Sequence, residues 1–396
     1  MPPKFDLQEI RADTPGLKNV THLLASGSAL MPQPVIDGVI NHTLLEAKYG
    51  GYEAQSIQSE MLDNVYNLVA AHIGARRHEI ALMENATVAW CHAFYALPLK
   101  PGSRILTCEA EYAANYVAFL QRAKRDNLRI EVVPSDATGA LDLAELENML
   151  DSDVSLIAIT WVPTNGGLVN PAAEVGKIAQ KFGVPYLLDA CQAAGQMRVD
   201  VEELGCDFMS ATGRKFLRGP RGTGFLYIKS KWLEVLEPAM IDHFGAPWVA
   251  RNQYALRDDA RRFETWENSY ALRAGLGKAI EYADKIGIDT IANQITQLSR
   301  KCRDQLSQID RLELRDIGTY QCGIVSFTID GTEPFDIVSG LSKVGFAIGS
   351  SPPSSTRLDA ERRELPTVLR IAPHYYNTES EIEQCITNIK GLISSA

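Results

Sequence analysis

The chain has 396 residues, of which 45% are hydrophobic and 22% are charged, and its formal net charge at pH 7 is −10. That length is sufficient for one large domain and one smaller domain. The negative charge argues against nucleic acid or an anionic membrane surface as a partner, because both attract basic patches. Neither a long apolar run nor a signal-peptide core is present, so we expect a cytoplasmic protein without membrane contact.

The seven cysteines are scattered and never form a CxxC pair, and the seven histidines show no HxxxH spacing. Scattered cysteines of this kind are typical of reduced thiols that are buried as small apolar side chains. The sequence therefore predicts neither a disulfide framework nor a metal site.

Along the chain, helical and strand-like segments alternate from about residue 58. Residues 58–74 carry apolar side chains at helical spacing, and 141–150 and 170–183 have amphipathic helix character. Short apolar runs typical of strands lie at 79–83, 104–109, 129–135, 155–160, 184–190, 207–212 and 223–228. Strands that are apolar on both faces and alternate with helices indicate a mainly parallel sheet with helices on both sides. We expect a large α/β domain with seven strands over residues 40–265.

The pattern changes in the C-terminal third. Residues 271–287, 290–309 and 380–393 are predicted helices, while 322–330 and 344–350 are strand-like. The segment 350–367, which contains several prolines and serines, has the composition of a mobile loop. These features predict a smaller α+β domain over residues 266–396.

A lysine and an aspartate stand at the ends of two predicted strands. Asp189 ends the apolar run at 184–190, and Lys215 lies in "SATGRKFLRGPRGTGFLYI" (210–228). Ligands of parallel sheets bind beyond the carboxyl ends of the strands. A buried carboxylate requires a cationic partner, and pyridoxal phosphate provides one in its protonated ring nitrogen while a lysine holds it covalently. For these two residues alone, a structural ion pair is the alternative.

Two further stretches are suited to a phosphate group. A predicted strand ends and a helix begins near Ala86 and Thr87, where free backbone N–H groups attract anions. Thr212 and Arg214 add a hydroxyl group and a cation next to the lysine.

The chain resembles the class V aminotransferase family of fold type I pyridoxal phosphate enzymes, which includes cysteine desulfurases and isopenicillin N epimerase. The resemblance covers nearly the whole chain. It rests on motifs in the family's order: "ASGSA" (25–29), "ENATVA" (84–89), "EAEYAAN" (109–115), "TWVPTNGGLVNP" (160–171), "LLDACQAAGQ" (187–196), "SATGRKFLRGPRGTGFLY" (210–227), "RRFETWEN" (261–268) and "VLRIAPHYYNT" (368–378).

The resemblance implies a role for each matching residue around the cofactor ring. Lys215 would be the Schiff-base lysine, and Asp189 would pair with the ring nitrogen. Gln192 would hydrogen-bond the ring hydroxyl, and Tyr112 would stack on the ring where desulfurases have a histidine. The phosphate would be bound by Ala86, Thr87, Thr212 and Arg214, although desulfurases usually have a histidine at the position of Arg214.

The family pattern also implies a substrate side and a partner subunit. Arg370 would bind the α-carboxylate of an amino acid substrate, near Thr164, Asn165 and Ser28. Residues 1–39 would pack on the active site and the small domain. Trp266 stands where the family reaches the phosphate site of a partner subunit, so a homodimer with a shared active site is implied.

The reaction follows less directly from these motifs. Desulfurases carry a nucleophilic cysteine on the loop that matches 350–367, and this chain has no cysteine between Cys322 and Cys385. We therefore expect a C–S lyase that performs β-elimination on a cysteine-derived or cysteine-sulfoxide substrate through an external aldimine. The motifs look most like those of the hercynylcysteine sulfoxide lyases. An epimerase, an aminotransferase and, as a non-enzyme, a regulatory module that only binds pyridoxal phosphate are the alternatives.

Overall fold

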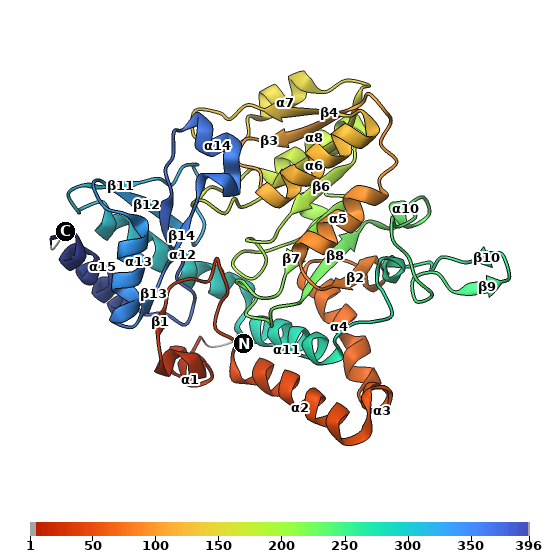
Figure 1. Ribbon diagram of the computed structural model, residues 1–396, viewed down its shortest axis with the longest axis horizontal. Helices are drawn as coiled ribbons and strands as arrows, with labels where there is room; N and C mark the ends of the chain where they lie inside the picture. Colours follow the sequence, from red (N-terminus) through yellow and green to blue (C-terminus); the bar gives the residue numbers. More distant parts are fainter. Residues whose placement is uncertain (1–4, 395–396) are drawn as a thin grey trace.

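The structure is a computed structural model in which residues 5–394 are described (Figure 1). Residues 1–4 of the predicted N-terminal segment and residues 395–396 of the predicted small domain lie outside the described residues. Within 5–394, no helix combines the length and the apolar character that a membrane span requires.

The main sheet of the described chain has seven strands in the spatial order β2-β8-β7-β6-β5-β3-β4. Neighbouring strands from β4 to β7 are parallel, whereas β8 runs antiparallel to both β7 and β2. Each predicted apolar run forms one of these strands, so the prediction of a mainly parallel seven-stranded sheet is confirmed. The strands are β2 (Ile80–Met83), β3 (Arg104–Cys108), β4 (Arg129–Val133), β5 (Val154–Thr160), β6 (Tyr186–Asp189), β7 (Phe208–Thr212) and β8 (Gly224–Ile228).

Helices cover both faces of this sheet (Figure 1). Consecutive strand residues point to opposite faces, so Leu187 belongs to the core under α5 and α6 while Leu188 belongs to the core under α4 and α8. Burial on both faces explains why these strands are continuous apolar runs. The helices and turns of this region are η2 (Arg77–Glu79), α4 (Ser59–His72), α5 (Ala86–Ala96), α6 (Ala113–Asp126), α7 (Leu143–Met149), α8 (Ala172–Phe182), α9 (Val201–Leu204) and α10 (Ser230–Leu233).

A second, antiparallel sheet lies in the C-terminal region. Its strand order is β11-β12-β15-β14, and α12, α13 and α15 bury Leu298, Leu341 and Ile389 in a third core. The elements are α12 (Ile288–Leu306), β11 (Leu312–Leu314), β12 (Val325–Ile329), α13 (Pro334–Lys343), β14 (Gly349–Ser351), β15 (Val368–Ile371) and α15 (Glu379–Ser394).

Two predictions for this region are wrong in detail. The segment 350–367 is not an irregular loop, because it contains the 3-10 turn η4 (Pro353–Thr356) and the helix α14 (Arg357–Arg362). The N–H of Asp359 donates to the carbonyl of Glu109 (3.1 Å), and Arg362 forms an ion pair with Glu109 (2.7 Å), so α14 is attached to the large domain. The run 344–350 forms two short strands, β13 (Phe346–Ala347) and β14, which pair with different partners.

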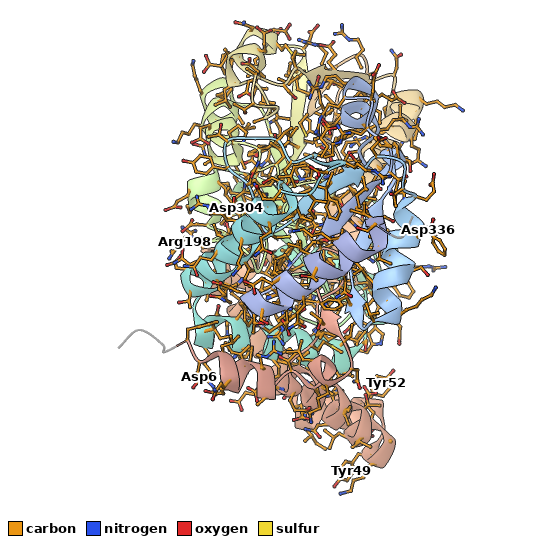
Figure 2. The ribbon with its side chains drawn as sticks, turned by 90° about the vertical axis from the view of Figure 1, so that its left-hand side faces the viewer. Asp6, Tyr49, Tyr52, Arg198, Asp304 and Asp336 are labelled. Atoms are coloured by element: carbon orange, nitrogen blue, oxygen red, sulfur yellow. The ribbon has the colours of Figure 1, made fainter. Side chains whose placement is uncertain are left out.

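The N-terminal segment crosses from the small sheet to the large one. Its β1 (Thr21–His22) pairs with β13, and Leu24 forms a bridge with Ala372. The following α2 packs against α11, and the end of α2 projects from the body of the molecule together with α3, with the exposed Tyr49 of α2 and Tyr52 of α3 at this tip (Figure 2). The elements are α1 (Leu7–Ala12), η1 (Pro15–Lys18), α2 (Gln33–Tyr49), α3 (Gly51–Ile57) and α11 (Tyr270–Ile286).

The division of the chain at residues 39 and 265 stays a prediction. The helix α11 is relevant to it, because α11 packs on α2 and α4 and contributes Leu276 and Ile280 to a core of the large sheet. Between the large sheet and α11 the chain forms an exposed hairpin, β9 (Trp248–Ala250) and β10 (Gln253–Tyr254), and the turn η3 (Ala260–Phe263).

Candidate active site

A pocket lies at the carboxyl ends of three neighbouring parallel strands. β5 ends at Thr160, β6 at Asp189 and β7 at Thr212, and parallel strands bring these ends to the same edge of the sheet. The turn after β7 adds Lys215. The pocket is lined by Tyr112, Thr160, Val162, Thr164, Asp189, Cys191, Gln192 and Lys215.

Asp189 is a buried carboxylate held by two N–H donors. Its Oδ2 accepts a hydrogen bond from Asn115 Nδ2 (2.9 Å), and its Oδ1 accepts one from the backbone N–H of Cys191 (2.8 Å). Burial raises the pKa of Asp189, while these donors and the charge of Lys215 lower it. The carboxylate is therefore suited to a cationic partner in the pocket.

Lys215 is buried in the same pocket and is close to a thiol. Burial raises the pKa of the Cys191 thiol, and the nearby Lys215 lowers it. Among the described residues, no ion pair joins Lys215 to Asp189. The purely structural Asp–Lys pair, considered above as the alternative, is thus not formed.

Gln192, Thr164 and Arg370 form a connected group on another side of the pocket. Gln192 Nε2 donates to the carbonyl of Ser26 (3.2 Å) and to Thr164 Oγ1 (3.4 Å). One Arg370 nitrogen donates to both the carbonyl (2.7 Å) and the hydroxyl (2.8 Å) of Thr164. The buried atoms Gln192 Oε1 and Arg370 Nε have no hydrogen-bond partner in the described structure. These two atoms are available to a ligand.

Arg370 is a buried cation without a carboxylate partner among the described residues. It lies on β15 and is 9% exposed, and its remaining contact is a long one to the carbonyl of Ser350 (3.4 Å). Burial lowers the pKa of Arg370 to about 10, so the side chain remains charged at neutral pH. A buried charge of this kind is suited to an anionic ligand.

The predicted phosphate residues do not all converge. Ala86 and Thr87 begin α5, whose first turn has no acidic residue, so its N–H groups attract an anion. Gly224 allows β8 to approach this helix start, since a Cβ there would lie 2.9 Å from Asn85 backbone carbon. Thr212 Oγ1 donates to the carbonyl of Thr223 (3.2 Å).

The side chain of Arg214 contacts the N-terminal segment. It donates to the carbonyl of Gly27. Arg214 still lies near the pocket, because its charge lowers the pKa of both Tyr112 and Cys191. Its predicted phosphate contact stays a prediction.

Three other predicted residues lie outside the pocket lining. Asn165 Oδ1 accepts a hydrogen bond from Ser351 of the small sheet (2.6 Å). Ser28 is half-buried in the turn beside Gly27. Trp266 is 41% exposed, and its ring packs near His243 (5.2 Å) and Tyr52 (6.5 Å). Within one chain, Trp266 thus belongs to a separate aromatic group.

Sequence reasoning missed Cys191, Asn115 and Glu111. Cys191 lies two residues after Asp189, in the turn that follows β6, and lines the pocket. Asn115 lies on the first turn of α6, three residues after Tyr112, and helical spacing is the signal that could have placed it on the pocket side. Glu111 is buried behind Asn115 and Thr160.

These groups fit pyridoxal phosphate. The carboxylate of Asp189 is matched to a protonated ring nitrogen, and the unpartnered Gln192 Oε1 is matched to a ring hydroxyl. Tyr112, 36% exposed, offers an aromatic face in the pocket, and the start of α5 offers N–H groups to a phosphate.

Comparison with known proteins agrees with this fit. A family model described as aminotransferase class-V matches residues 21–385. A probable cysteine desulfurase from Pyrococcus abyssi is 28% identical and is covered over 98% of both chains. One from Xylella fastidiosa is 30% identical, over 98% of this chain and 95% of the relative. The apo structure of the cysteine desulfurase from Thermococcus onnurineus NA1 matches at a TM-score of 0.93 with 25% identity, over the whole of both chains.

The family model spans both sheets and each of the strand ends that form the pocket. The prediction of the family, of the fold and of the cofactor is therefore confirmed. The chain belongs to the class V aminotransferase family, and it is a pyridoxal phosphate-dependent enzyme.

Proposed function

We propose that the protein is a C–S lyase that removes the sulfur substituent from a cysteine-derived amino acid or its sulfoxide. The observation that supports this most directly is the buried guanidinium of Arg370, next to a pocket that also contains Lys215 and Asp189. A free amino acid brings the carboxylate that Arg370 lacks among the described residues. The pocket thus has separate groups for the carboxylate, the ring and the reacting carbon.

The pocket residues have distinct roles in this proposal. Lys215 would hold the cofactor covalently, and Asp189 would face its ring nitrogen and favour the protonated form. When bound, the cofactor would supply an acceptor for the electron pair left at Cα of the substrate. The Lys215 amine would take the proton from Cα. The Cβ–S bond then breaks and sulfur leaves as a thiol, or as a sulfenic acid from a sulfoxide; addition of water yields pyruvate and ammonia.

Other predicted residues keep supporting roles. Tyr112 would offer its aromatic face to the cofactor ring, and Gln192 would hydrogen-bond the ring hydroxyl. The start of α5 at Ala86 and Thr87, with Thr212 and Arg214, binds the phosphate. Thr164 orients Arg370 through two hydrogen bonds, and Asn165 and Ser28 flank the substrate side. A homodimer in which Trp266 contacts the partner, and a cytoplasmic location, stay predictions.

Cysteine desulfurase is the second candidate, because the curated relatives described above carry that name. In such a reaction, an enzyme thiol attacks the sulfur of cysteine and alanine is released, leaving a persulfide on the enzyme. Cys191 lines the pocket and is the thiol that this chain offers there. However, burial raises the pKa of Cys191, which disfavours the thiolate that attacks sulfur. Residues 350–362, which face the large domain, contain no cysteine.

The test is a product analysis with purified holoenzyme. S-substituted cysteines, their sulfoxides and free L-cysteine are each incubated without a keto acid, and pyruvate, alanine and the D-isomer are measured in parallel. Pyruvate from the substituted substrates supports the lyase. Alanine from L-cysteine that disappears in Cys191→Ser would support the desulfurase, while D-isomer or strict dependence on a keto acid would support an epimerase or an aminotransferase.

A variant pair connects this activity to the site. Lys215→Ala is expected to lower kcat by about 10³-fold, since proton transfer by a positioned group contributes on that order. Borohydride should fix the cofactor to the wild-type chain at Lys215 and leave the variant unlabelled. The exposed Lys177 is the control, and Lys177→Ala should retain wild-type turnover and labelling.

A further inference from the structure

Glu111 is a buried carboxylate that accepts hydrogen bonds from four N–H and O–H donors. It follows β3, is 3% exposed, and accepts from Thr107 Oγ1 (3.0 Å), the N–H of Tyr112 (2.8 Å), Asn115 Nδ2 (2.8 Å) and Thr160 Oγ1. A carboxylate has about four acceptor positions, so this set saturates it. Within residues 5–394, none of its hydrogen-bond partners is a cation, which is unusual for a buried acid.

The donors connect Glu111 to three residues of the pocket. Asn115 Nδ2 donates both to Glu111 Oε1 (2.8 Å) and to Asp189 Oδ2 (2.9 Å), and an amide nitrogen has one hydrogen for each. Tyr112 is held through its backbone N–H and Thr160 through its hydroxyl. Asp189, Tyr112 and Thr160, which come from three different elements, thus depend on one side chain.

We propose that Glu111 is a positioning residue for the cofactor, which fixes Asp189 and Tyr112 against the ring and adds a second negative charge behind Asp189. This inference rests on the proposed placement of the ring nitrogen against Asp189. A carboxylate behind Asp189 favours the protonated ring nitrogen, because two negative charges attract the same proton.

The surroundings of Glu111 support an electrostatic role. The titratable groups that face it are Asp189, the thiol of Cys108 (3.9 Å from Oε2) and the phenol of Tyr186. Burial, and to a lesser extent the charge of Asp189, raise the pKa of Glu111 while its hydrogen-bond donors lower it, and together these effects bring it to about 7. The chain thus places two acids side by side without a cation between them, and a cationic ring nitrogen beyond Asp189 compensates both.

A purely structural role for Glu111 makes a different prediction. In that case, its loss would lower stability and leave the cofactor's titration unchanged. Glu79 provides a matched control, because it is 4% exposed and accepts from the N–H groups of Arg76 (2.9 Å) and Ser230 (2.9 Å). It directly precedes β2, at the edge of the sheet opposite to the one where the pocket lies.

The test compares Glu111→Gln with Glu79→Gln in the holoenzyme. The readouts are the pH midpoint of the cofactor's visible absorption change, the dissociation constant of pyridoxal phosphate, kcat, KM and the melting temperature. Glu111→Gln is expected to move the midpoint to lower pH by about one unit, as loss of a nearby charge does. It should also lower kcat by about tenfold or more with a smaller change in KM. Glu79→Gln should lower only the melting temperature.

A midpoint and a kcat for Glu111→Gln that match those of Glu79→Gln would overturn the inference. Asn115→Ser is the second variant, in case Glu111→Gln does not fold. It removes the bridge to Asp189 while Glu111 keeps three donors, so we expect it to move the midpoint as well. The double variant should shift the midpoint by less than the sum of the two single shifts, because both changes remove the same bridge; additive shifts would contradict the proposed bridge.

Asp189→Asn separates this inference from the proposed function. If Asp189→Asn leaves the cofactor's absorption titration unchanged, the ring does not lie against Asp189 and the proposed placement fails. If Asp189→Asn changes the titration while Glu111→Gln and Asn115→Ser do not, the placement holds and only the role of Glu111 fails.

Discussion

Two arginines from the small sheet region, the largely buried Arg303 and the buried Arg370, are connected to the same loop after β5, and their partners differ. Arg303, on α12, donates through Nε to Asp316 (2.7 Å) and through one amino group to the carbonyls of Cys322 (2.8 Å) and Ile324 (2.7 Å). Asp316 connects this pair to the loop, because it accepts from the N–H of Gly167 (2.8 Å). Arg370 contacts the other end of the loop at Thr164, but among the described residues it has only neutral oxygen partners, and its Nε has none.

The difference separates structure from ligand binding. Arg303 and Asp316 form an ion pair within the chain, so their charges compensate each other and the pair can be understood as part of the fold. Around Arg370 the compensating charge is absent from the described residues, and burying an uncompensated cation costs free energy. A protein keeps such a group where a ligand supplies the missing charge. A buried arginine is therefore informative about function only when its partners are also considered.

The largest effect that this comparison predicts is on stability, at Asp316. Asp316→Asn leaves the Arg303 guanidinium buried with only carbonyl partners, which we expect to lower the free energy of unfolding by about 3–5 kcal/mol. Denaturant or thermal unfolding of the holoenzyme measures this loss. The control is Asp289→Asn, which removes an exposed ion pair with Arg198 (2.8 Å) and should cost less than about 1 kcal/mol. Equal losses for the two variants would contradict the comparison.

The next effect is on catalysis, at Arg370. Arg370→Met keeps the stem of the side chain and removes the charge, so the substrate carboxylate loses hydrogen bonds worth about 1.5–3 kcal/mol. We expect kcat/KM to fall roughly 10- to 100-fold, which steady-state kinetics with the best lyase substrate would measure. The melting temperature should stay the same or rise, because an uncompensated buried cation is removed. A large loss of stability with unchanged kinetics would show that Arg370 has a structural role, as Arg303 does, and does not bind the substrate.

Much of the fold could be predicted because its signals are local. Runs such as 155–160 are apolar on both faces and lie between amphipathic helices, and each of them forms a strand of the main sheet. The segment 350–367 was harder, because its prolines are typical of loops while Pro353 is also compatible with the start of a helical turn. The attachment of α14 through Glu109 is a long-range contact that periodicity does not report.

The site was predictable only in part. Lys215, Asp189, Gln192 and Tyr112 follow strand or helix ends, and the structure brings them to one pocket. The direction of Arg214 toward Gly27 depends on how the N-terminal segment crosses the sheet, which no local pattern indicates. Glu111 was missed for another reason. A glutamate in a sequence is expected at the surface, and its burial among hydrogen-bond donors becomes visible only in the structure.

The smallest predicted effect tests the two arginines through matched hydroxyl groups. The Thr164 hydroxyl accepts a hydrogen bond from Arg370. The Ser326 hydroxyl donates one to Asp316 Oδ1 (2.7 Å), next to Arg303. Removing either hydroxyl costs one hydrogen bond to a charged group, about 1.5–3 kcal/mol. If the comparison is right, the same chemical change has two different outcomes, because one hydroxyl orients a ligand-binding charge and the other supports a pair within the fold.

We expect Thr164→Val to raise KM for the amino acid by roughly five- to tenfold and to leave the melting temperature within about 1 °C of that of the wild type. Ser326→Ala should instead lower the melting temperature by about 2–4 °C and leave KM within about twofold. Measuring both quantities on both variants gives a crossed result if Arg370 binds the substrate. If both variants lower the melting temperature by the same amount and leave KM unchanged, Thr164 and Ser326 both have a structural role. Arg370 would then be a structural arginine, as Arg303 is.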